Sequence, residues 1–140
     1  MEMIDSVTII AAFFRDETHH KFAKPIFDKI LSGALENAFI TDYIIDEVVT
    51  FARKRKGKVA SIEILDVLLT APQFKIIKIN DIYLDSAIRF FRQYDNISFT
   101  DATTIAVMLD KGIKNIYSFD SDFDNIPYIK RLEKPQNSYH

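Results

Sequence analysis

The stretch AFITDYIIDEVVTFA, from Ala38 to Ala52, contains the change of pattern that decides the fold. Its first four residues, Ala38 to Thr41, form a short apolar run that predicts a buried strand. Thr41 or Asp42 can then cap a helix. The apolar residues after this cap recur at helical spacing: Ile44, Ile45, Val48, Val49, Phe51 and Ala52. The stretch therefore predicts a strand followed directly by a helix.

The same strand-to-helix pattern recurs along the chain. We predict short strands at 1–4, 38–41, 74–79, 115–118 and 128–132, with helical segments in the intervals between the first four of them. Such alternation produces a parallel sheet covered on both faces. The predicted fold is α/β, a three-layer α/β/α sandwich whose central, mainly parallel sheet has four or five strands.

Individual residues predict where several elements begin and end. The long helical segment after Thr41 is interrupted at Gly57, which predicts a helical hairpin before the third strand. Ser98 and Asp101 have the spacing of a capping box, and Gly112 is placed to end the helix that follows. We expect residues 1–132 to form one domain and the polar residues 133–140 to form a flexible tail.

The composition limits the class of protein. With 140 residues, 48% of them apolar, the chain can build one domain with a substantial core. It has no cysteine, which excludes disulfides, a thiolate nucleophile and a cysteine-based zinc site. Its net charge of −2 allows only a local basic patch. The apolar run at 7–14 is too short for a membrane helix, so we expect a cytoplasmic protein with no membrane segment.

Acidic residues follow the predicted strands, where open parallel sheets bind their ligands. Asp5 ends the first strand, and Asp120 closely follows the strand at 115–118. Glu47 lies one helical turn or so beyond Thr41. These three carboxylates are therefore predicted to meet at one edge of the sheet.

Two candidate carboxylates have apolar surroundings in the sequence. Glu47 borders the apolar arc of its helix, and Asp101 lies between Phe99 and Ile105. A desolvated cluster of carboxylates needs a cation to cancel its mutual repulsion. Ligation by oxygen alone favours Mg²⁺ or Mn²⁺ over Zn²⁺, and such ions suit phosphodiester hydrolysis because they polarise phosphate and activate water.

Taken singly, each carboxylate also has a purely structural explanation. Asp5 and Asp101 can serve as helix caps, Glu47 can pair with a lysine or arginine, and Asp120 can be a turn residue. The functional interpretation therefore depends on the four residues occurring together and in this order along the chain.

That order resembles the PIN domain family, whose members include the VapC toxins of prokaryotic toxin–antitoxin pairs. Four segments, spread over nearly the whole chain, carry the resemblance: MIDS at 3–6, TDYIIDE at 41–47, SFTDA at 98–102 and SFDSDF at 118–123. The last segment has Ser118 where the family usually has threonine.

The resemblance implies an endoribonuclease that depends on Mg²⁺ or Mn²⁺. The implied catalytic residues, which are also its metal ligands, are Asp5, Glu47, Asp101 and Asp120. Asp122 is an alternative or additional metal ligand, with Asp120 preferred because it follows the strand more directly. The hydroxyls implied to orient water or carboxylates are those of Ser6, Thr41 and Ser118. The implied partners are RNA, a second copy in a homodimer and, in the toxin branch, a small antitoxin protein.

Two other groups of residues have ambiguous roles. The basic run can bind the phosphate backbone of RNA, and its members are Arg53, Lys54, Arg55, Lys56 and Lys58. Alternatively, these cations only stabilise a helix C-terminus, an effect of about 0.3 to 1 kcal/mol. His19 and His20 lie in a polar stretch, where we expect them to be solvated.

Three alternative functions fit parts of the sequence. The first is a catalytically inactive PIN scaffold that binds RNA or a protein partner. The second is a receiver-like signalling domain that accepts a phosphoryl group, with Lys134 before Pro135 as its basic residue. The third is a phosphatase of the haloacid dehalogenase type, but such enzymes carry the tripeptide found here at 120–122 after their first strand. The four retained carboxylates favour an active ribonuclease.

Overall fold

The structure is a computed structural model that describes residues 1–136. Strands and helices alternate along this part of the chain as the sequence predicts. In chain order the elements are β1 (Glu2–Ile4), α1 (Ser6–Phe13), α2 (His20–Leu31), β2 (Ala38–Thr41), α3 (Asp42–Lys56), α4 (Lys58–Thr70), β3 (Phe74–Ile77), α5 (Asp81–Gln93), α6 (Phe99–Lys111), β4 (Asn115–Tyr117), the short 3₁₀ helix η1 (Ser121–Asn125) and β5 (Lys130–Leu132).

The five strands form one sheet in the order β3-β2-β1-β4-β5, and every neighbouring pair is parallel. Strand order advances from β1 to β3 in one direction and then resumes on the other side of β1 with β4. The sheet therefore has its switch point between β1 and β4, and the carboxyl ends of all strands lie at one edge. The predicted α/β fold is confirmed.

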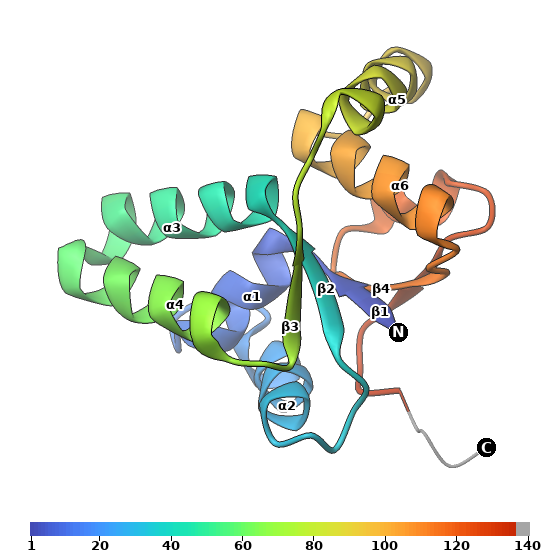
Figure 1. Cartoon of the computed structure of the whole chain (residues 1–140). Coiled ribbons are helices and arrows are strands. Elements are labelled where there is room, and N and C mark those ends of the chain that lie inside the picture. Colours follow the sequence, from blue (N-terminus) through green and yellow to red (C-terminus); the bar gives the residue numbers. More distant parts are fainter. Residues whose placement is uncertain (137–140) are drawn as a thin grey trace.

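The connections explain why helices cover both faces of this sheet. Crossovers between parallel strands are right-handed, so α1 to α4, which connect β1 to β2 and β2 to β3, share one face. The chain then returns across the sheet through α5 and α6, which consequently cover the opposite face. Figure 1 shows these two groups of helices on opposite sides of the strands.

The core lies where the central strands meet α1 and α6. Met3 and Ile4 of β1 have no exposed surface, nor has Ile116 of β4. Helix α6 is buried without interruption from Ala102 to Met108. Because β1 and α6 are enclosed on nearly all sides, any polar group at their ends needs a partner within the protein.

The predicted caps are present. Thr41 and Ser98 each accept a hydrogen bond from the first turn of the helix that follows. Asn80 caps α5 in the same way. Ser98 and Asp101 form the reciprocal capping box. Gly112 ends α6 in the left-handed conformation, with a φ of 68°, which glycine adopts without strain.

Several strand boundaries differ from the prediction by one or two residues: β1 begins at Glu2, β4 ends at Tyr117 and β5 begins at Lys130. Strand β3 ends at Ile77 and not at Ile79, because the backbone N–H of Ile79 donates to the side chain of Asp42 (3.0 Å). This bond joins residues 37 positions apart, so periodicity along the sequence cannot indicate it.

The end of the chain is partly described. The backbone N–H of Gln136 donates to the Tyr117 hydroxyl (3.2 Å), which holds residues before 137 against β4. Residues 137–140 of the predicted flexible tail lie outside the described residues, so the division into a domain at 1–132 and a tail stays a prediction. Within residues 1–136, the helices are too short or too polar to cross a membrane.

Candidate active site

Asp5 and Ser118 meet at the switch point of the sheet. Asp5 follows β1, and only 5% of its surface is exposed. Its Oδ1 accepts the backbone N–H of Thr8 (2.9 Å), which caps α1, and its Oδ2 accepts the hydroxyl of Ser118 (2.5 Å). Ser118 follows β4, so this hydrogen bond joins the carboxyl ends of the two central strands.

Asp120 belongs to the same hydrogen-bonded network. The backbone N–H of Asp120 donates to the oxygen of the Ser118 hydroxyl (3.0 Å), which in turn donates to Asp5. The half-buried carboxylate of Asp120 accepts the backbone N–H of Asp122 (2.9 Å) and so starts η1. Ser118 therefore fixes the loop after β4 relative to Asp5.

Asp101 approaches this network from α6. Its backbone and side chain exchange hydrogen bonds with Ser98, 3.0 and 3.2 Å long. Burial raises the pKa of Asp101 to about 6, and the charges of Asp5 and Asp120 add to this increase. The pKa of Asp5 is also raised, mainly by burial and partly by the charge of Asp120. Asp5, Asp101 and Asp120 thus form one electrostatic group, the three-aspartate group.

Glu47 is connected to this group through Ser6. The Ser6 hydroxyl donates to Glu47 Oε1 (2.6 Å), and Ser6 is the residue next to Asp5. Glu47 is half-buried on α3, which packs against α1. The hydroxyl of Thr41, by contrast, accepts the backbone N–H of Ile44 (3.1 Å) as the cap of α3. The proposed supporting roles of these hydroxyls stay predictions.

The donors suit a hard divalent cation. Within residues 1–136, no three His, Asp or Glu side chains are already gathered as a metal site. Like-charged carboxylates favour separated positions when no cation lies between them. Its donors are all carboxylate oxygens, which Mg²⁺ and Mn²⁺ accept readily. The three-aspartate group therefore fits the predicted ion, with Glu47 beside it.

Two residues near the site were not anticipated from the sequence. Arg131 of β5 donates to the carbonyl of Ser118 (3.2 Å) and pairs with the exposed Asp124. Thr8, which is fully buried, donates its hydroxyl to the carbonyl of Tyr117 (3.1 Å). Both side chains hold the end of β4 in place. A threonine in an apolar helix and an arginine near the chain end give no sequence signal for these contacts.

The two histidines are not solvated as expected. His19 is half-buried and stacks on Phe119, with ring centroids 4.6 Å apart and an interplanar angle of 5°. Nδ1 of His20 lies 2.7 Å from the carbonyl oxygen of Ala11. The turn before α2 folds back onto the loop after β4, which polarity along the sequence cannot indicate.

The basic run lies at the tip of the α3–α4 hairpin, away from the three-aspartate group. Lys54 is seven residues beyond Glu47 on α3, or about 10 Å along the helix axis. Arg53 donates to Ser61 (2.8 Å), Lys56 pairs with Asp16 (2.5 Å), and Arg55 lies over the ring of Phe51. Lys54 and Lys58 are exposed. A role of this run in RNA binding stays a prediction.

Comparison with known proteins identifies a family and a relative that are similar to this chain. A model of the PIN domain family matches residues 3–128, which include all the candidate carboxylates. The 23S rRNA-specific endonuclease VapC20 of Mycobacterium tuberculosis is similar in sequence, with 27% identity over 95 residues. The aligned part covers 64% of this chain and 70% of that relative.

Solved structures share the fold. The crystal structure of M. tuberculosis VapC20, a toxin that cleaves the sarcin–ricin loop, gives a TM-score of 0.79 at 22% identity and covers 89% of this chain and 93% of that one. VapBC2 from Rickettsia felis, bound to a DNA fragment of its promoter, gives 0.67 at 14% identity, covering 94% and 96%. A toxin–antitoxin complex from Klebsiella pneumoniae gives 0.62 at 18% identity, covering 93% and 96%.

We predict that metal-free protein loses stability as pH rises from 5 to 7.5. The pKa of Asp101 is near 3.8 when unfolded and about 6 when folded, so the folded state binds more protons between these values. The stability that this group contributes is complete below pH 3.8 and is lost as pH rises through about 6. Urea unfolding in EDTA measures it. The Asp101→Asn variant should show a shallower pH dependence, and parallel profiles would contradict the assignment.

We also predict that Ser118→Ala destabilises the protein by about 1 to 3 kcal/mol, because it leaves Oδ2 of the buried Asp5 carboxylate without its hydrogen-bond donor. Urea unfolding in EDTA at pH 7.5 measures the change. Ser121→Ala, an exposed position on η1, is the matched control and should remain within about 0.5 kcal/mol of the natural sequence. Equal stability of the two variants would show that Ser118 does not support Asp5.

Proposed function

The chain belongs to the PIN domain family, and from that premise we propose that it is an endoribonuclease that depends on Mg²⁺ or Mn²⁺. The observation that supports this most is the buried hydrogen bond between Asp5 and Ser118 at the switch point of the sheet. It places a carboxylate that is costly to desolvate where this class of fold binds ligands, beside two further carboxylates.

In this proposal the carboxylates bind the metal ion, and two serine hydroxyls position the carboxylates. Asp5, Asp101 and Asp120 would hold the ion. Glu47, which accepts a hydrogen bond from Ser6, would be a fourth carboxylate beside them. When bound, Mg²⁺ or Mn²⁺ polarises the scissile phosphate and lowers the pKa of a water molecule. Ser118 and Ser6 act as positioning residues, because each donates a short hydrogen bond to one of these carboxylates.

RNA is the proposed substrate. The similar protein VapC20 is named as a 23S rRNA-specific endonuclease, and at 27% identity it supports the same class of substrate here. The exposed cations Lys54 and Lys58 provide positive charge at the hairpin tip for phosphates that extend beyond the three-aspartate group. The proposal covers RNA as the class of substrate and does not include the particular RNA that VapC20 cuts.

A toxin role with a protein partner is the proposed biological context. The structures of similar fold include two described as VapBC or toxin–antitoxin complexes, from R. felis and K. pneumoniae. We therefore propose a small antitoxin protein as the partner of this chain. The homodimer implied by the family resemblance stays a prediction.

The alternative functions differ in how well they agree with membership of the PIN domain family. Membership of the PIN family argues against the receiver-like and phosphatase alternatives, which rest on short motifs alone. A PIN scaffold that binds RNA without cutting it keeps the same fold and carboxylates. Cleavage must therefore be measured directly.

We expect the purified protein to cut a labelled RNA of mixed structure in the presence of Mg²⁺ or Mn²⁺. EDTA should abolish cutting because it removes the ion, and Asp101→Asn should reduce it about 100-fold or more because it removes a charged ligand. Asp66→Asn, an exposed position on α4, is the matched control and should cut like the natural sequence.

The outcomes separate enzyme from scaffold. Cutting that persists in EDTA or in Asp101→Asn would mean that the three-aspartate group is not the active site. No cutting of any RNA with either metal, together with retained RNA binding in a gel-shift assay, would favour the inactive scaffold.

A further inference from the structure

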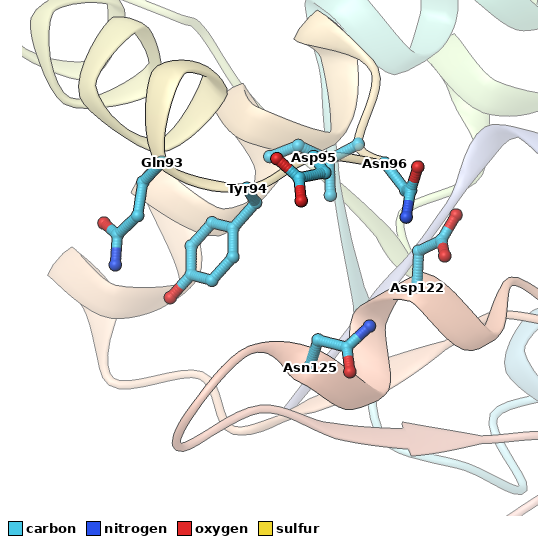
Figure 2. Close-up of a pocket in the computed structure, with 7 residues that line it drawn as sticks. Gln93, Tyr94, Asp95, Asn96, Asp122 and Asn125 are labelled. Carbon is cyan, nitrogen blue, oxygen red and sulfur yellow. The ribbon is translucent and has the colours of Figure 1, made fainter.

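A polar cavity of about 170 Å³ lies between the α5–α6 connection and η1. Figure 2 shows Tyr94, Asp95 and Asn96 on one side of this cavity, and Asp122 and Asn125 on the other. Gln93, at the end of α5, also lines it, and so does the buried side chain of Ile97. We call this the η1 cavity.

The η1 cavity is linked to the three-aspartate group through residues on both of its walls. On the η1 wall, Asp122 lines the cavity, and its backbone N–H donates to the carboxylate of Asp120 (2.9 Å). On the opposite wall, Ile97 precedes Ser98, whose capping box holds Asp101. The cavity therefore lies beside residues that hold two of the three aspartates.

The lining of the cavity excludes a phosphate group as its occupant. It contains the carboxylates of Asp95 and Asp122 and contains no lysine or arginine. An anion placed there would be repelled by both carboxylates and would find no cation to pair with. The cavity therefore suits an uncharged group that can donate hydrogen bonds.

The remaining lining residues suit a flat, polar ring. The side chain of Tyr94 presents an aromatic wall, and its ring lies against Phe90 with centroids 6.5 Å apart. Asn96 and Asn125 are exposed, so their side-chain amides are accessible to a ligand in the cavity. Single-stranded RNA bases are recognised by this combination of aromatic contact and hydrogen bonds to the base edge.

We propose that the η1 cavity receives one nucleobase of the RNA next to the scissile phosphate, and selects bases with an exocyclic amino group. The ionised carboxylates of Asp95 and Asp122 accept hydrogen bonds but cannot donate them, so they favour the amino groups of cytosine, adenine and guanine over the carbonyl oxygens of uracil. The inference deepens the proposed ribonuclease function and rests on it for the identity of the RNA substrate.

Binding of nucleosides tests the cavity without requiring catalysis. Cytidine and uridine differ in the exocyclic group, amino against carbonyl, and in the ring nitrogen beside it, which carries a hydrogen only in uridine. Adenosine and inosine form a second such pair. All four are uncharged, so the carboxylates of the three-aspartate group do not repel them. The readout is the backbone amide signals of the lining residues Tyr94 and Asp122 in ¹H–¹⁵N NMR spectra of the full chain in EDTA.

Cytidine and adenosine should shift these signals, with uridine and inosine binding about 5-fold or more weakly. The Asp95→Asn variant should lose much of this preference, because its amide can also donate to a carbonyl oxygen. Asp85→Asn, an exposed position on α5, is the matched control and should keep it. Equal shifts with all four nucleosides, or no shift with any of them, would overturn the proposal.

Cleavage of an RNA library with randomised sequence separates this inference from the proposed function. The protein should favour amino-bearing bases over uracil beside the cut, by about 5-fold or more, and Asp95→Asn should cut with that preference reduced. If Asp95→Asn cuts with an unchanged preference, the cavity assignment fails and the ribonuclease stands. If the natural sequence cuts no RNA, the ribonuclease fails and nucleoside binding alone decides the cavity.

Discussion

Asp5 has 5% of its surface exposed, and its two carboxylate oxygens accept hydrogen bonds from Thr8 and Ser118. The second of these bonds joins residues 113 positions apart in the chain, at the ends of β1 and β4. A carboxylate enclosed in this way keeps its charge only at a cost in free energy, which its raised pKa reflects. The parallel sheet makes this position unavoidable, because the carboxyl ends of β1 and β4 must be adjacent at the switch point.

The hydrogen-bonded network extends from Ser118 to Asp122. The Ser118 hydroxyl accepts the backbone N–H of Asp120, and the carboxylate of Asp120 accepts the backbone N–H of Asp122, whose side chain lines the η1 cavity. Asp120, which caps η1, and Asp122, in its first turn, therefore have different surroundings. The charges near Asp120 are those of carboxylates that suit a metal ion, whereas Asp122 shares its cavity with the amides of Asn96 and Asn125. One short 3₁₀ helix thus connects the proposed cleavage site to the proposed base-recognition site.

Much of the fold could be predicted from the sequence, because apolar periodicity and caps such as Thr41 and Ser98 are local signals. The position of Asp5 at the end of β1 was predictable for the same reason. Its two possible roles, cap and site residue, could not be separated, since one oxygen caps α1 while the other meets Ser118. Contacts that require tertiary packing gave no signal: the stacking of His19 on Phe119 and the bond from Arg131 to Ser118.

Counting bound Mn²⁺ by electron paramagnetic resonance tests most directly whether these carboxylates hold a divalent ion. Free Mn²⁺ in solution gives a sharp signal that falls as the ion binds, so titration of the full chain yields its stoichiometry and affinity. We predict at least one bound Mn²⁺ per chain at pH 7.5, with about 10-fold or greater loss of affinity in Asp5→Asn. Equal binding by the natural sequence and Asp5→Asn, or no binding by either, would contradict the assignment of the metal to the switch point of the sheet.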